Sequence, residues 1–433
     1  MSKKGVIIFV SILLFTFLRK YLVILSPIVL IVIAYLFRLK LTKNILLIIS
    51  LTIIFSVISF FQNGFFAANF IISLLLFLLP IIVLLSRAKN QFFELEDWFS
   101  LSSKVLLFVN FSALINFLFV LISGQGLLDD GFNGLYGRSG LSMHTLALVN
   151  FIYTSYFFVQ KNFKTGIIFF LSAILCFYGL GTLIFIFTVL IVLILNLNKR
   201  YFKYLIVSPV LIIIVFSLLV KIKPTAIHYL NENIDRAVHS FTKYNNKFDN
   251  EMDRVERFLT TKTPRKILAF RSYFEKITNS KSNILLGIGP GTYNSRTSFL
   301  LNGEYTKNPI FKKISSEPPL AVKYIYPLWN SKITYQYNDG TRNEPFSSFL
   351  SVLSEYGLII TLMLIYLLFK LYQRVSKVDN RNKFFIQFIF LFFALNLMLE
   401  NYVEYPEFFL LAIIIIKPLE CFDPNNAENN INK

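Results

Sequence analysis

Long apolar runs recur along most of this 433-residue chain, and no other feature of the sequence constrains its fold as strongly. About 20 apolar residues form a helix that crosses the hydrocarbon core of a bilayer. Hydrophobic residues make up 55% of the chain and charged residues only 15%, which argues against two or three soluble domains. The runs are continuous rather than alternating, so helices are favoured over a β-barrel. The sequence therefore predicts an all-α fold, a polytopic membrane helical bundle.

The apolar runs predict about twelve transmembrane helices. They cover residues 5–18, 21–37, 45–61, 66–86, 100–123, 144–160, 166–178, 180–196, 203–220, 345–370, 383–399 and 406–417. The first two could be one helix, and so could the pair that flanks Gly179. The basic N-terminus resembles a signal peptide, but no small-residue cleavage site follows, so a first transmembrane helix is the better interpretation. Asparagines within the runs, such as Asn110 and Asn150, are expected to bridge helices.

Basic residues are distributed unequally between alternate loops, which predicts the orientation of the chain. With the N-terminus in the cytoplasm, most loop lysines and arginines fall inside, while the short outside loops hold only Arg19, Lys20 and Arg138. The Arg19–Lys20 pair is the one discordant feature. We therefore expect a multi-pass protein of a bacterial inner membrane, with both termini in the cytoplasm.

The same pattern divides the chain into four parts. We predict an N-terminal transmembrane bundle at 1–221, an extracytoplasmic, periplasmic loop at 222–344, C-terminal transmembrane helices at 345–418 and a cytoplasmic tail at 419–433. The loop has amphipathic helical periodicity in its first half. It holds 19 Lys and Arg against 11 Asp and Glu. Positive-inside topology does not explain this excess, which indicates an anionic glycolipid or anionic lipid headgroups as a partner.

Several function classes are disfavoured by what the sequence lacks. It has no GxxxxGK[ST] loop, no HExxH and no CxxC pair, and its three histidines show no metal-ligand spacing on one helix. Two cysteines cannot form a disulfide framework. The net charge of +19 is explained largely by basic residues at helix ends, so we expect no nucleic-acid partner. We expect no metal and no cofactor.

Two segments carry motifs that bear on function. The first reads FRSYFEKI at 270–277 and NILLGIGPGTY at 283–293. Its glycine turn is either an ordinary tight turn or a place where backbone approaches a ligand closely. The second reads PFSSFLSVLSEYGLI at 345–359, and a weaker RSG element lies at 138–140.

The order and position of these segments resemble the O-antigen polymerase and O-antigen ligase family. In that family an arginine on an amphipathic helix precedes a glycine-rich turn, and a segment with Glu and Gly then re-enters the membrane. The resemblance implies a glycosyltransferase whose donor is an oligosaccharide on undecaprenyl diphosphate, with no nucleotide sugar and no metal. The family often has a histidine after the proline that opens the re-entry segment, but this chain has Phe346 there. Another group would then activate the acceptor.

The leaving diphosphate directs the choice of candidate site residues, because the planar fork of arginine matches phosphate and stabilises charge on the leaving oxygen. The predicted catalytic residues are Arg138, Arg271, Glu344, Glu355 and His144. The predicted substrate-binding residues are Gly287, Gly289, Gly291, Arg265 and Arg342. Each arginine could equally be a solvated or snorkelling residue, and Glu355 could be structural, near the beginning of a helix.

We expect a polymerase that joins undecaprenyl-diphosphate-linked repeats into a surface polysaccharide, O-antigen or capsule. A ligase that transfers the glycan to lipid A-core is the alternative, and the long loop favours the polymerase, which must hold two glycolipids. A transporter or flippase of lipid-linked sugars is a rival of another class. Matched pairs of broken helices in the two halves of the chain would favour a transporter, and only one such pair, at 166–196, is evident. Expected partners are the lipid-linked oligosaccharide, membrane lipids, and a flippase or chain-length regulator.

Overall fold

The computed structural model describes residues 2–64, 66–123, 131–137, 142–196, 265–278, 280–300, 318–329, 347–378, 382–400, 402 and 404–420. Regular structure within these ranges is helical, apart from one isolated bridge between Lys40 and Arg87. The all-α prediction is therefore confirmed for the described residues. The predicted span at 203–220 and the tail at 419–433, beyond Glu420, lie outside them.

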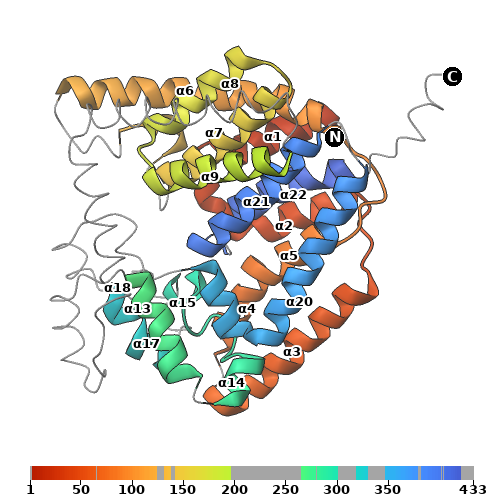
Figure 1. Ribbon diagram of the computed structural model, residues 1–433, viewed down its shortest axis with the longest axis vertical. Helices are drawn as coiled ribbons and strands as arrows, with labels where there is room; N and C mark the ends of the chain where they lie inside the picture. Colours follow the sequence, from red (N-terminus) through yellow and green to blue (C-terminus); the bar gives the residue numbers. More distant parts are fainter. Residues whose placement is uncertain are drawn as a thin grey trace.

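The helices fall into three groups along the chain (Figure 1). The N-terminal group is α1 Lys3–Phe15, α2 Leu22–Leu36, α3 Lys43–Asn63, α4 Ala67–Ser73, α5 Leu79–Leu85, α6 Leu95–Ser123, α7 Ser142–Val159, α8 Phe163–Leu175 and α9 Gly179–Leu195. The middle group is α13 Arg265–Ser272, α14 Lys281–Leu286, α15 Arg296–Leu300, α17 Pro319–Tyr324 and α18 Tyr326–Trp329. The C-terminal group is α20 Ser348–Val378, α21 Lys383–Leu399 and α22 Pro406–Glu420. Short helical turns, among them Phe17–Tyr21, Leu74–Leu78 and Tyr273–Ile277, join several of them.

Five of the described helical stretches are long and apolar enough to cross a membrane. They are Phe17–Leu36, Lys43–Asn63, Ala67–Leu85, Leu95–Ser123 and Ser348–Lys377. Shorter apolar helices occupy Met143–Val159, Phe163–Leu175, Gly179–Leu195 and Lys383–Leu399. These helices identify the chain as a membrane protein. The count of twelve spans, the orientation of the termini and the side of the membrane on which the loop lies stay predictions.

The structure decides how the predicted spans are divided at three places. Extended backbone at Thr16 separates α1 from α2, and Phe177, with φ 52°, separates α8 from α9, so neither pair is a single helix. The predicted span at 345–370 is interrupted, because Gly357 within α20 has φ 79° and ψ 170°. This break divides α20 into a short first part and a long second part.

Helix α22 lies at the centre of the bundle and contacts α2, α5, α6 and α20. Its residues 408–419 are all buried, which fits a helix that is apolar on every side. The outer helices α2, α3 and α6 instead expose large apolar side chains, and Tyr35, Phe61 and Ile122 are 80%, 88% and 84% exposed. Acyl chains of a bilayer are the solvent that such side chains require.

Polar side chains within the bundle bridge helices, as predicted. Asn110 of α6 and Asn150 of α7 donate to each other's amide oxygen at 2.6 and 3.2 Å. Arg19, the discordant basic residue, is only 4% exposed. Its Nη1 lies 3.4 Å from Oε1 of Glu407, and its guanidinium lies 4.4 Å from the ring centre of Tyr136. A buried pair holds this charge, so it does not contradict the predicted orientation.

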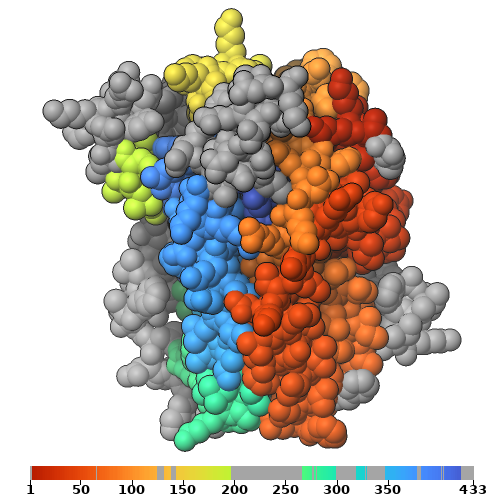
Figure 2. Space-filling model, turned by 90° about the vertical axis from the view of Figure 1, so that its right-hand side faces the viewer, coloured from red at the N-terminus to blue at the C-terminus, as the bar shows by residue number. Residues whose placement is uncertain are grey.

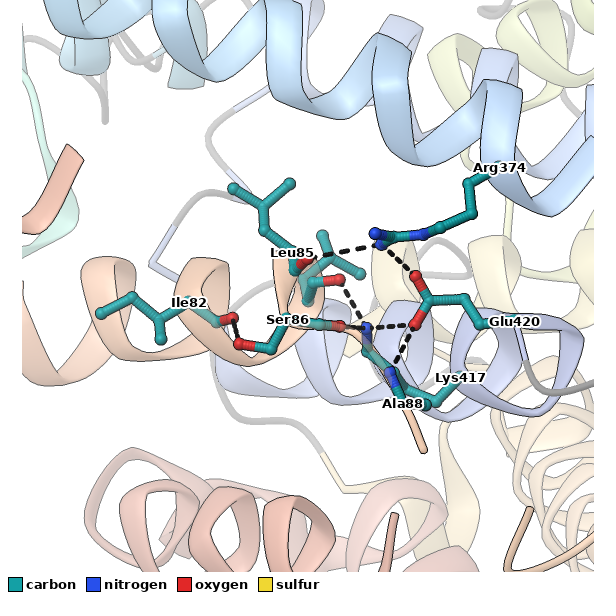
Figure 3. A network of polar contacts seen from close by, with 8 residues as sticks. Ile82, Leu85, Ser86, Ala88, Arg374, Lys417 and Glu420 are labelled. Atoms are coloured by element: carbon teal, nitrogen blue, oxygen red, sulfur yellow. Dashed lines mark hydrogen bonds and ion pairs between the residues drawn. The ribbon is translucent and has the colours of Figure 1, made fainter. Parts of the chain in front are cut away.

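Residues predicted to face the cytoplasm meet at one end of the bundle. The ammonium of Lys417, which is fully buried, lies 2.8 Å from Oε2 of Glu420 and donates to the carbonyl of Leu84 at 2.8 Å (Figure 3). Arg374 of α20 pairs with the other oxygen of Glu420. Carbonyls at the end of α5 carry partial negative charge, which favours these cations. The network fixes α20 and α22 to α5.

Candidate functional site

The glycine turn at 287–291 packs against the first part of α20. The N–H of Ile288 donates to the carbonyl of Ser354 at 2.9 Å, and the N–H of Gly289 donates to the carbonyl of Glu355 at 3.1 Å. Along one face of the molecule, α14 and α20 lie beside α3 (Figure 2). From α3, Ser59 donates to the carbonyl of Gly287 at 3.0 Å. The structure therefore brings together the two segments that carry the family resemblance.

Glycine is required here by the close approach of two backbones. Gly287, Gly291 and Gly357 have φ of 80°, 73° and 79°, and Gly289 has φ of 112°. A Cβ at Gly287 would lie 2.4 Å from a carbonyl oxygen of α20, and a Cβ at Gly357 would lie 2.4 Å from a carbonyl oxygen of α14. At Gly287 the space beside the Cα is therefore filled by backbone of α20. The predicted substrate-binding role of the three turn glycines is not tested by these contacts.

Glu355 anchors the segment that follows the glycine turn. Its carboxylate is 1% exposed and accepts the backbone N–H groups of Gly291, Tyr293, Asn294 and Ser295 at 2.6 to 3.0 Å. Hydrogen bonds from backbone to a carboxylate are stronger than neutral ones and set the path of a loop. All four donors belong to the one segment 291–295, so the geometry favours a positioning role for Glu355.

A second buried carboxylate, Glu404, holds the next few residues. Its oxygens accept the N–H and the hydroxyl of Thr297 at 2.6 and 2.9 Å, and the hydroxyl of Ser73 at 2.8 Å. Burial raises the pKa of Glu404, and the hydrogen bonds from Thr297 and Ser73 oppose that shift. Arg296 donates to the Glu404 carbonyl at 3.2 Å and lies 4.0 Å from the ring centre of Tyr405. Sequence analysis did not include Glu404, although it follows an apolar run.

Arg271 lies on α13, which packs on the same structure. An apolar cluster joins Leu268 of α13 to Ile288 and Tyr293 beside the glycine turn and to Leu350 of α20. The guanidinium of Arg271 pairs with Glu275 one turn later, and the Arg271 side chain is 25% exposed. This predicted catalytic arginine therefore lies on an element fixed to the turn, and part of it reaches the surface.

The sequence did not point to a buried ion pair between Lys266 and Glu400. Nζ of Lys266, on α13, lies 2.9 Å from Oε1 of Glu400, which directly follows α21. The side chain of Glu400 is 2% exposed, and burial raises its pKa while Lys266 opposes the shift. A charged residue at the end of an apolar run is a functional candidate by default, and this signal could have identified Glu400.

His144 lies at the beginning of α7. Its ring stacks on Tyr178, with centroids 4.1 Å apart and planes at 15°. Nδ1 is buried and makes no hydrogen bond in the described structure. The hydroxyl of Tyr402 donates to that of Tyr178 at 3.4 Å. Through Tyr178, this predicted catalytic residue is therefore linked to the segment that follows Glu400.

The remaining predicted site residues are placed as follows. Arg138, Glu344 and Arg342 lie outside the described residues, as does Phe346, and Arg265 begins α13 without a described side chain. Within the part of the chain that is described, no group of three or more His, Cys, Asp or Glu could hold a metal ion. No model of a known protein family matches the sequence, and no curated protein matches it.

Proposed function

We propose that this chain is a membrane glycosyltransferase that polymerises undecaprenyl-diphosphate-linked oligosaccharide repeats into a surface polysaccharide, O-antigen or capsule. One observation carries the proposal. The arginine helix, the glycine turn and the re-entry segment, which together resemble the polymerase and ligase family, form one packed unit at an end of an apolar bundle. In the predicted orientation this end of the bundle faces outward, where the diphosphate headgroup of the donor is expected.

The chemistry follows from the donor. A hydroxyl of the acceptor glycan attacks the anomeric carbon, the bond to the lipid diphosphate breaks, and the diphosphate leaves with the electron pair. Arg271 exchanges its partner Glu275 for the diphosphate and stabilises the charge on the leaving oxygen. Glu355 and Glu404 hold the backbone that supports this arginine. The reaction needs no nucleotide.

The break in α20 favours this enzyme over the transporter rival. Transporters use broken helices to expose backbone groups to a substrate or an ion. At Gly357 the break is instead filled by backbone of α14 and of the glycine turn. A helix break that is closed by the protein's own backbone offers no coordination site.

Deletion of the gene tests the proposed function, with the surface polysaccharide examined on a gel in a strain that has no second enzyme of this kind. A polymerase deletion collapses the ladder to core plus a single repeat. A ligase deletion leaves bare core and long chains on the lipid carrier. An unchanged ladder together with an unchanged lipid-linked pool contradicts the proposal.

Complementation with Arg271 variants then tests the site. Arg271→Ala abolishes the ladder at an unchanged protein level, and Arg271→Lys restores it partly, because an ammonium cannot form the bidentate contact. Lys281→Ala on α14, an exposed basic residue nearby, is the matched control and retains the ladder. Full activity of Arg271→Ala, or equal loss in both alanine variants, contradicts a specific role for Arg271.

A further inference from the structure

Three buried carboxylates contact the middle group of helices or the turns between them, and their surroundings differ. Glu355 accepts four backbone N–H groups, and Glu404 accepts three hydrogen bonds from Thr297 and Ser73. The side-chain oxygens of Glu400, by contrast, have a single described charged partner, Lys266. Oε1 of Glu400 faces Lys266 and has no second donor within the described structure, although it is buried. Glu400 is therefore the carboxylate of these three with the fewest described donors.

The backbone around Glu400 is held firmly, as a reactive group requires. The carbonyl of Glu400 accepts the N–H and the hydroxyl of Ser348 at 3.0 and 2.7 Å, so the beginning of α20 fixes it. The N–H of Tyr402 donates back to the Ser348 hydroxyl at 2.8 Å. The carboxylate is thus positioned by the same re-entry segment that carries Glu355.

Lys266 of α13 pairs with Glu400, and His144 of α7 is linked to the same segment through Tyr178 and Tyr402. The Lys266 side chain is 20% exposed, so it is open to an anion that approaches from the surface. His144 is half-buried and stacked on Tyr178, and the hydroxyl of Tyr402 donates to that of Tyr178 at 3.4 Å. A Cβ at Gly181 would lie 2.1 Å from the Tyr178 ring, so this glycine makes room for the stack.

From this arrangement, and resting on the function proposed above, we propose that Glu400 is the general base that accepts the proton of the acceptor-sugar hydroxyl, with Lys266 transferring from Glu400 to the donor diphosphate. Donor binding then frees the carboxylate. As the hydroxyl oxygen forms its bond to the anomeric carbon, its proton passes to Glu400, and the electron pair of the broken bond leaves with the diphosphate, next to Lys266. The protonated Glu400 later releases its proton to water.

The test uses the full-length protein in proteoliposomes, with lipid-linked repeats extracted from a strain that lacks the gene. General bases contribute about 10²–10⁴-fold to a rate. Glu400→Gln is therefore expected to lower turnover by about 100-fold or more, and its residual rate should lose the fall at low pH that protonation of Glu400 causes in the wild type. Glu400→Asp keeps the carboxylate and should keep that pH dependence at a lower rate.

Glu407→Gln is the control, because Glu407 is also a largely buried carboxylate, 10% exposed and paired with a cation, Arg19, and makes no described contact with Glu400 or Lys266. It should change turnover less than about threefold, well below the effect of losing a base. A Glu400→Gln variant with wild-type turnover, or one with lower turnover but an unchanged pH profile, overturns the role of Glu400. If the wild type itself consumes no lipid-linked repeat, the proposed function fails instead, so the two failures are distinguishable.

Discussion

Replacing Gly357 by alanine tests the contact between α14 and α20. With φ 79° and ψ 170°, this residue lies in a region that is essentially restricted to glycine, and a side chain there costs about 1–3 kcal/mol. The added Cβ would lie 2.4 Å from the carbonyl oxygen of Leu285 and 2.5 Å from the nitrogen of Gly287. Both are backbone atoms, so no rotamer change relieves the overlap.

The overlap forces the two backbones apart, which also breaks the hydrogen bonds from Ile288 to Ser354 and from Gly289 to Glu355. Each contributes about 1 kcal/mol, so Gly357→Ala should lower the free energy of unfolding by about 3–5 kcal/mol in total. The ladder of surface polysaccharide should shorten as well, because the glycine turn no longer fits.

The free cysteine Cys176 provides the assay, because it is buried and becomes reactive to a maleimide dye when the bundle opens. Unfolding is followed by dye reaction in detergent titrations of the purified protein, in a Cys421→Ser background. Gly179→Ala is the control, since a Cβ at Gly179 meets nothing within 4 Å and its φ is not positive. If Gly357→Ala unfolds at the same detergent concentration as Gly179→Ala, the backbone contact does not stabilise the fold as reasoned.

Two further predictions concern the opposite end of the bundle and the orientation of the chain. Lys417→Met should destabilise the protein by about 1–3 kcal/mol, because it leaves the buried carbonyls of Leu84 and Ser86 without this donor, while Glu420 keeps Arg374 as its partner. The same detergent titration measures this, and a change below about 1 kcal/mol, the range of surface pairs, would show that the network is not stabilising. Single cysteines at the exposed positions Lys281 and Lys377 should label oppositely in spheroplasts, the first from outside and the second only after permeabilisation, and outside labelling of both would contradict the predicted orientation.

Part of the candidate site could be read from the sequence. The glycine turn, Glu355 and Gly357 stand out as motifs, and the structure does bring them together. The sequence could not say that Glu355 would accept four backbone N–H groups, because that depends on how the turn folds around its carboxylate. Lys266 and Glu400 were missed for a related reason, since they are 134 residues apart and neither belongs to a motif.

The sequence by itself determined that the chain is a helical membrane protein. Lipid satisfies no backbone polar group, so a continuous apolar run has to become a helix whatever lies beside it. The tertiary structure alone decided where the helices end and break, which partner each buried charge finds, and that α22 is central. Arg19, for example, pairs with Glu407 near the other end of the chain. The solvent preference of a run is a local property of its residues, whereas the partner of a buried charge depends on the packing of distant segments.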